Sequence, residues 1–96
     1  MLLQVSIPVE KGNEAFDNGA LRQVIQAAMD SLNPEATYFF PDRNGNRSRM
    51  LVFDMEGSWQ LPPVVEPMFH RLNATVYLTP VMNGEDLQRG MQAASA

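Results

Sequence analysis

Few side chains in this 96-residue sequence could carry out chemistry, and they form no known catalytic motif. His70 is the only histidine, so it could act as a general base but could not make a metal site by itself. Asp54 and Glu56 lie two residues apart, which on a strand places both carboxylates on one face, where paired acids can exchange protons. A surface histidine and solvated carboxylates are the commoner explanations. We expect no metal and no cofactor, and the catalytic candidates are His70 and Asp54.

Aromatic side chains offer a second kind of site, a pocket that binds a ligand. Tyr38, Trp59 and Tyr77 could line a cavity for an aromatic molecule, which their polar ends would orient. The same three side chains could equally pack in a core or in a subunit interface. Both alternatives stay open at the level of the sequence.

Three arginines, Arg43, Arg47 and Arg49, lie close together in the sequence. A guanidinium pairs well with a carboxylate or a phosphate, so this cluster could hold an anionic ligand. Charged residues that keep strand edges from aggregating are the commoner explanation of such a cluster. The candidate ligand-binding residues are therefore Tyr38, Trp59, Tyr77 and Arg49.

Composition and charge limit the class of protein. The chain is long enough for one globular domain and is 45% hydrophobic, so we expect a single domain over 1–96. A net charge of −4 argues against nucleic acid as a partner. The sequence has no apolar run long enough to span a bilayer, no signal peptide and no cysteine. We expect a cytoplasmic protein without a membrane partner.

The segment Ser48–Met55 predicts the strand around which the domain is organised. Leu51 and Phe53 lie on one side of an extended chain, and Met50 and Val52 lie on the other. A strand that is apolar on both sides needs cover on both faces of its sheet. In so short a chain, helices can cover one face and a second copy of the protein can cover the other.

Two periodicities predict the first part of the chain. Alternating apolar residues over Leu3–Val9 predict a strand, in which Pro8 ends the ladder pairing on one side. Residues 10–13 should form a loop. Apolar residues spaced three and four apart then predict a helix over 15–32, which the following Asn-Pro pair ends.

Residues 37–40 predict a second strand, joined by a hairpin to the strand 48–55. The Asn-Gly pair between them is typical of a two-residue turn. Such a turn would place Pro41 in a hydrogen-bonded pair, where it has no N–H to donate. We therefore prefer a longer loop from Pro41 to about Arg47.

The rest of the chain repeats the order of helix and strand. A helical stripe follows a pair of prolines, but Pro67 lies inside it, so the helix is either regular only from about Glu66 or kinked there. Residues 75–82 alternate as a strand. A short helix over 84–92 should follow, because Asn83 resembles a helix cap.

This order of elements predicts an α+β fold, the ferredoxin-like βαββαβ arrangement, with a four-stranded antiparallel sheet in the order 4-1-3-2. The opposite face of the sheet would carry apolar and aromatic side chains, which are seldom left to water. We expect a homodimer paired through this sheet face; the alternative is a monomer whose C-terminal helix shields it. Both main helices would cover one face, toward Leu3, Val5, Ile7, Val76 and Leu78.

Three stretches carry a resemblance to known proteins, at residues 34–41, 51–55 and 66–82. They are similar to small uncharacterised actinobacterial proteins, and this resemblance covers nearly the whole chain. Those proteins look like the dimeric α+β barrel superfamily, which includes antibiotic-biosynthesis monooxygenases and small cyclase-like proteins. The resemblance implies a dimeric α+β barrel.

The monooxygenase members of that superfamily oxidise aromatic polyketides without metal or flavin, in a pocket between sheet and helices. Trp59 and His70 are loosely similar to that pattern, although their spacing and the nearby prolines depart from it. We therefore favour a small homodimeric protein that binds a small apolar or aromatic ligand. The alternative is a cofactor-independent monooxygenase or cyclase acting on an aromatic polyketide-like substrate, with Asp54, Trp59, His70 and Tyr77 as working residues.

Overall fold

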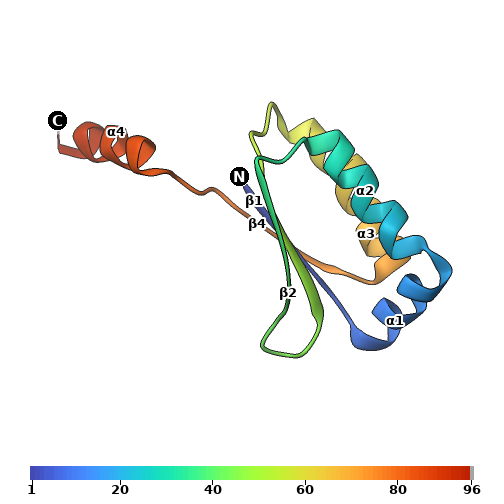
Figure 1. Ribbon diagram of the computed structural model, residues 1–96. Coiled ribbons are helices and arrows are strands. Elements are labelled where there is room, and N and C mark those ends of the chain that lie inside the picture. The colour runs from blue at the N-terminus through green and yellow to red at the C-terminus, as the bar shows by residue number, and fades with distance from the viewer. Residues whose placement is uncertain (96) are drawn as a thin grey trace.

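A computed structural model describes residues 1–95 and shows an α+β fold, in which helices pack on one face of a four-stranded antiparallel sheet (Figure 1). The last helix, at the C-terminus, stands apart from the other elements (Figure 1). In chain order the elements are β1 (Leu2–Ile7), α1 (Val9–Asn18), α2 (Ala20–Leu32), β2 (Ala36–Pro41), β3 (Arg47–Val52), the 3-10 helix η1 (Ser58–Gln60), α3 (Leu61–Leu72), β4 (Thr75–Thr79) and α4 (Gly84–Ser95).

The strands lie in the order β2-β3-β1-β4, so β1 and β3 are central. This is the predicted order, and it reflects the hydrophobicity of the two central strands. Leu3 lies opposite Leu51 in β3 and opposite Leu78 in β4, and each neighbouring pair of strands is antiparallel. Because side chains alternate across a strand, this register gives every residue of the sheet a definite face.

The core lies between the sheet and helices α1 to α3. Leu3, Val5 and Ile7 point into it as predicted. Of the two residues expected from β4, Val76 packs against the core, whereas Leu78 keeps 38% of its surface exposed. The buried apolar residues are Leu3, Val5, Ile7, Ala15, Ala20, Val24, Ile25, Ala28, Leu32, Leu51, Phe53, Val64, Met68 and Leu72.

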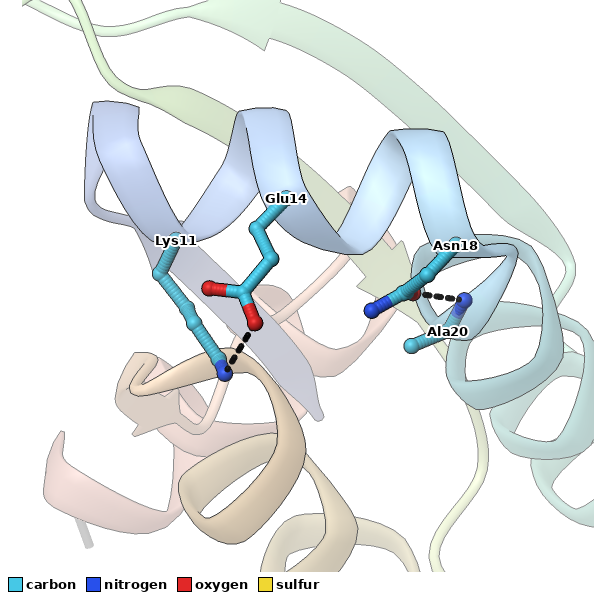
Figure 2. A network of polar contacts seen from close by, with 4 residues as sticks. All are labelled: Lys11, Glu14, Asn18 and Ala20. Carbon is cyan, nitrogen blue, oxygen red and sulfur yellow. Dashed lines mark hydrogen bonds and ion pairs between the residues drawn. The ribbon is translucent and has the colours of Figure 1, made fainter.

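The segment after β1 differs from the prediction, because residues 10–13 are helical and the helix expected over 15–32 is two helices. The break is at Gly19, whose φ of 84° is a left-handed conformation that favours glycine. Asn18 stabilises the junction: its Oδ1 accepts a hydrogen bond of 2.9 Å from the Ala20 N–H (Figure 2). The periodicity did not reveal α1 because the residues that this helix buries, Gly12 and Ala15, are small.

Helix α1 is mostly solvent-exposed and carries an ion pair of its own. The Nζ atom of Lys11 lies 3.6 Å from Oε1 of Glu14, one turn further along the helix (Figure 2). Such an exposed pair contributes little to stability. The buried side of the helix is formed by Gly12 and Ala15, so α1 approaches the sheet closely.

The connection between β2 and β3 is the longer loop that the sequence predicts. Pro41 is the last residue of β2 and lies opposite Arg47, the first residue of β3. Asp42 N–H donates to the Asn46 carbonyl at 2.9 Å, and Gly45 N–H donates to the Asp42 carbonyl at the same distance. The third strand is shorter than expected, because it ends at Val52 and not at residue 55.

In the second half of the chain the structure decides between the two alternatives for the proline-containing helix, shortens the predicted strand over 75–82 and confirms the C-terminal helix. Helix α3 begins at Leu61 and includes Pro67, so a helix that is regular only from about Glu66 is wrong. Strand β4 ends at Thr79, before Pro80. The predicted C-terminal helix is present as α4, and Asn83 caps it by accepting a 2.8 Å hydrogen bond from the Asp86 N–H through its Oδ1. No helix within residues 1–95 is long and apolar enough to cross a membrane.

Phe53 is the largest fully buried side chain, so its truncation tests the core. We expect Phe53→Ala to lower the free energy of unfolding by about 3–5 kcal/mol, because it removes apolar contacts and leaves a cavity. Phe69→Ala is the control, since Phe69 is 44% exposed and should cost much less. Urea denaturation at one protein concentration measures both; equal losses would contradict this placement of the core.

Candidate functional site

A groove lies between helices α1 and α2 and the part of the sheet formed by β2 and β3. Its volume is about 590 Å³. Its floor comes from the helix-facing side of the two strands, and one wall comes from α2. The residues that line it are Ile7, Phe16, Asp17, Gly19, Leu21, Arg22, Ile25, Gln26, Met29, Phe39, Arg47, Ser48 and Arg49.

Two arginines of β3 enter this groove because they lie two residues apart and so share the helix-facing side of the strand. The guanidinium carbon of Arg47 lies 5.7 Å from the ring centroid of Phe16. The guanidinium carbon of Arg49 lies 5.6 Å from the ring centroid of Phe39. At these distances each guanidinium is attracted to the face of its ring. The two rings therefore hold two positive charges inside a groove whose lining also includes the charged residues Asp17 and Arg22.

Within residues 1–95, each of the two guanidiniums makes one polar contact, which leaves most of its N–H donors without a partner there. Arg47 Nη1 donates to Oδ1 of Asn13 at 2.9 Å, and Arg49 Nη1 contacts the sulfur of Met29 at 3.9 Å. Within residues 1–95, no carboxylate lies within ion-pair distance of either arginine. A guanidinium has five N–H donors and pairs most strongly with an anion.

Helix α1 lies close to β3, and the absence of a side chain at Gly12 leaves space there for the Arg47 guanidinium. A Cβ atom on Gly12 would lie 2.8 Å from Nη1 of Arg47, closer than real Cβ contacts allow. Only glycine at this position lets the guanidinium lie against the helix in its present conformation. The groove also has exposed aromatic surface, because Phe16 is 66% and Phe39 is 59% exposed.

A second hollow, of about 730 Å³, lies on the opposite, open face of the sheet. Asp42 lines it, and the Oδ2 atom of this residue accepts hydrogen bonds from the hydroxyls of Ser6 at 2.7 Å and Ser48 at 2.9 Å. Its Oδ1 accepts from the N–H groups of Asn44 at 2.9 Å and Asn46 at 3.0 Å. The lining residues are Gln4, Ser6, Phe40, Pro41, Asp42, Arg43, Asn44, Asn46, Thr75, Tyr77 and Thr79.

These hydrogen bonds favour the charged form of Asp42. The pKa of Asp42 is held below its ordinary value of 3.8, chiefly by the Ser6 hydroxyl and the Asn46 N–H, and desolvation opposes this only in part. The Ser48 hydroxyl and the Asn44 N–H lower the pKa further. The carboxylate thus ties the β2–β3 loop to both central strands, which indicates a structural role.

The predicted ligand-binding residues are divided between the two faces of the sheet. Arg49 lines the groove. Tyr38 and Tyr77 lie on the open face at the two ends of one row, Tyr38–Met50–Gln4–Tyr77, which crosses all four strands. Three strand spacings separate the two tyrosines, about 14 Å. A ligand that contacts both tyrosines in a single subunit has to bridge the two central strands between them.

The remaining candidates lie outside both hollows. Asp54 is exposed just after β3, and Trp59 lies in η1 with 70% of its surface exposed. His70 lies on the exposed side of α3, where its Nε2 atom is 3.2 Å from Oε2 of Glu66. None of these three side chains lines the groove or the open-face hollow. Their predicted catalytic and binding roles stay predictions.

The structure also divides the arginine cluster. Arg47 and Arg49 lie in the groove, whereas Arg43 lies in the loop and lines the open-face hollow. The residues that the sequence did not single out are Phe16, Met29 and Phe39. One signal was available for Phe39, because in the longer-loop hairpin it lies opposite Arg49. No such signal links Phe16 to Arg47, since the α1 helix itself was not predicted.

Comparison with known proteins adds no family assignment. No family model matches the chain, and neither the curated proteins nor the solved structures include a match. Residues 1–95 contain no cluster of histidine, aspartate and glutamate that could hold a metal ion. The groove with its two arginines is therefore the feature on which a functional proposal rests.

The Asp42 contacts predict a pH dependence of stability. Because its pKa is lowered by folding, Asp42 stabilises the native state above its unfolded pKa, near 3.8, and this contribution is lost as the pH falls through the lower, folded value. We expect Asp42→Asn to lower the free energy of unfolding at pH 6, and we expect the difference from wild type to shrink at pH 3. Urea denaturation at both pH values measures it. Asp17→Asn is the charge-matched control, and a difference that does not depend on pH would contradict this account.

Proposed function

We propose that this protein binds a small anionic molecule with an aromatic or apolar body in the groove between α2 and the β2–β3 strands. The observation that supports the proposal is the pair of arginines in the groove, each stacked on a phenylalanine ring and without a carboxylate partner in residues 1–95. The two guanidiniums lie in one hollow of a chain whose net charge is −4, and Arg22 lines the same hollow.

The shape and chemistry of the groove define the ligand class. Its volume of about 590 Å³ lies within the range of small-molecule sites, roughly 300–1,000 Å³. Ile25 and Met29 supply an apolar wall, and Phe16 and Phe39 supply ring faces and edges. A carboxylate or phosphate on the ligand would pair with the guanidiniums, while its apolar body would replace water on these side chains.

We further infer that the chain forms a homodimer of the ferredoxin-like, α+β barrel type. The strand order and the placement of three helices on one face are compatible with that arrangement. The open face supports pairing of two sheets, because Tyr38 and Tyr77 are 61% and 56% exposed on it, beside half-buried Met50 and Val52. The alternative of a monomer shielded by its own C-terminal helix has less support, since α4 buries no residue.

The enzymatic alternative, a cofactor-independent monooxygenase or cyclase, also has less support. A general base must come within hydrogen-bonding reach of its substrate. Asp54 and His70, which would act as bases, do not line the groove. A binding role requires only the arginines and the apolar and aromatic side chains that line the groove.

The ligand proposal is tested with 2-naphthoate and its uncharged analogue 2-naphthamide. We expect 2-naphthoate to bind at least 10-fold more tightly, because only the carboxylate can pair with the guanidiniums. Arg49→Gln should weaken naphthoate binding about 10-fold or more, since a hydrogen bond to a charged group contributes about 1.5–3 kcal/mol. Titration followed by amide chemical shifts measures the affinity and locates the site.

Arg43→Gln is the matched control, because it removes the same charge from the neighbouring loop without touching the groove. It should leave naphthoate affinity nearly unchanged. Equal binding of the acid and the amide, or equal losses in the two arginine variants, would show that the groove does not recognise an anion.

The dimer is tested by sedimentation velocity at micromolar concentration. We expect a mass of twice 10.7 kDa for the wild-type chain. Tyr38→Lys should shift the protein to the monomer, because it places a charge in the paired sheet faces, yet it should leave the fold intact because Tyr38 is exposed in one subunit. Val9→Lys, at an exposed position on α1, is the control. A wild-type monomer would refute sheet pairing.

A further inference from the structure

The last part of the chain, Pro80–Ser95, forms an arm that stands away from the rest of the protein (Figure 1). It consists of a four-residue connector and helix α4, and α4 contains no buried residue. The radius of gyration is 15.3 Å and the longest extent is 54 Å. A compact chain of this length would have a radius of gyration of about 12.5 Å. The arm thus extends away from its own subunit and does not pack against it.

The arm carries apolar side chains that are exposed in the single subunit. Leu87 and Met91 are 50% and 59% exposed and lie four residues apart on one side of α4. Val81 and Met82 in the connector are 43% and 65% exposed. A 12-residue helix is marginally stable in water by itself. Its apolar side therefore needs a surface to pack against.

The connector directs this helix away from its own sheet. Thr79 precedes Pro80, and a residue before proline is restricted to extended conformations. No glycine lies between β4 and Gly84 to reverse the chain. Figure 1 shows the result, a chain that leaves the end of β4 in an extended course. An extended, proline-containing connector favours contact with a different copy over a return to the same one.

An arm that packs on a second copy adds buried area to the paired sheets. Stable interfaces bury about 800 Å² of accessible surface per partner. A helix of 12 residues, about 18 Å long, supplies additional area of the required kind. A second copy offers both surfaces at once.

We propose that two copies exchange their arms, so that Leu87 and Met91 of each α4 pack against the apolar end of the other copy's open sheet face. That end is the row Ala36–Val52–Leu2, which the register places across β2, β3 and β1. This inference rests on the sheet-paired homodimer proposed above and adds the surface that completes it. Each copy then donates one arm and receives one, as a two-fold axis requires.

An isotope-filtered NOE experiment tests the exchange directly. A uniformly 13C-labelled chain is mixed with an equal amount of unlabelled chain and allowed to equilibrate. We expect intermolecular cross-peaks from the methyl groups of Leu87 and Met91 to those of Val52 and Leu2. Cross-peaks that occur only within one chain would show that the arm folds back on its own sheet, and the absence of any arm-to-sheet cross-peak would show a free arm. Either result would overturn the proposal.

A pair of matched variants separates the arm from the sheet. Leu87→Ser with Met91→Ser should weaken the dimer about 100-fold, because two large apolar side chains no longer pack on the partner. Gln88→Ser with Gln92→Ser changes the same helix off its apolar side and should leave the dimer affinity within about twofold. Both are measured by sedimentation equilibrium.

The outcomes distinguish this inference from the proposal on which it rests. An unchanged dimer in the Leu87/Met91 variant would refute the exchange and leave sheet pairing intact. A wild-type chain that stays monomeric would refute both. Binding of 2-naphthoate to the groove is measured separately, since none of the arm residues lines that groove.

Discussion

The alternation of side chains along β3 is the constraint on which the rest of this structure depends. The pairing of Leu51 with Leu3 fixes the register of the two central strands. From that pair onward, Arg49 and Arg47 fall on the helix-facing side, and Met50 and Ser48 fall on the open side. One strand therefore contributes to the core, to the groove and to the open face. A shift of the β3 register by one residue would turn Ser48 and Met50 toward the helices and Leu51 toward the open face, so the register is strongly specified.

The helix-facing side of β3 tolerates Arg47 and Arg49 because this part of the sheet, next to the edge strand β2, is open to solvent. Burying an unpaired charge in a core costs several kcal/mol. The helices cover β1 and β3 near Leu51, but the part of the sheet near Arg47 and Arg49 opens to solvent as the groove. Stacking on Phe16 and Phe39 keeps the guanidiniums in place without neutralising them. The result is a positively charged hollow that the net charge of the chain does not suggest.

The sequence predicts those parts of the fold that depend on local periodicity. The strand order, the α2 helix, the longer β2–β3 loop and the cap at Asn83 all follow from residue spacing and from the chemistry of proline and asparagine. Helix α1 could not be predicted in this way, because it packs through two small residues, Gly12 and Ala15, and not through large apolar side chains. The groove was missed for a related reason: Arg47 and Phe16 meet only through the α1 helix. Single residues that are rare in the sequence, such as His70 and Trp59, attracted attention by type, but the structure leaves both exposed.

The two proposed binding surfaces lie on opposite faces of one sheet, and this bears on whether they influence each other. Arg49 and Met50 are adjacent in sequence, yet they point to the groove and to the open face respectively. Coupling between two sites needs an element with two arrangements whose equilibrium both sites bias. Strand β3 pairs with a strand on both sides and contributes Leu51 to the core, so a change in its arrangement would disrupt the sheet and the core together. We therefore expect the groove and the sheet-plus-arm interface to act independently. Substitutions of the odd-numbered residues of β3, which face the groove and the core, should affect ligand binding, and substitutions of the even-numbered residues, which face the open side, should affect self-association.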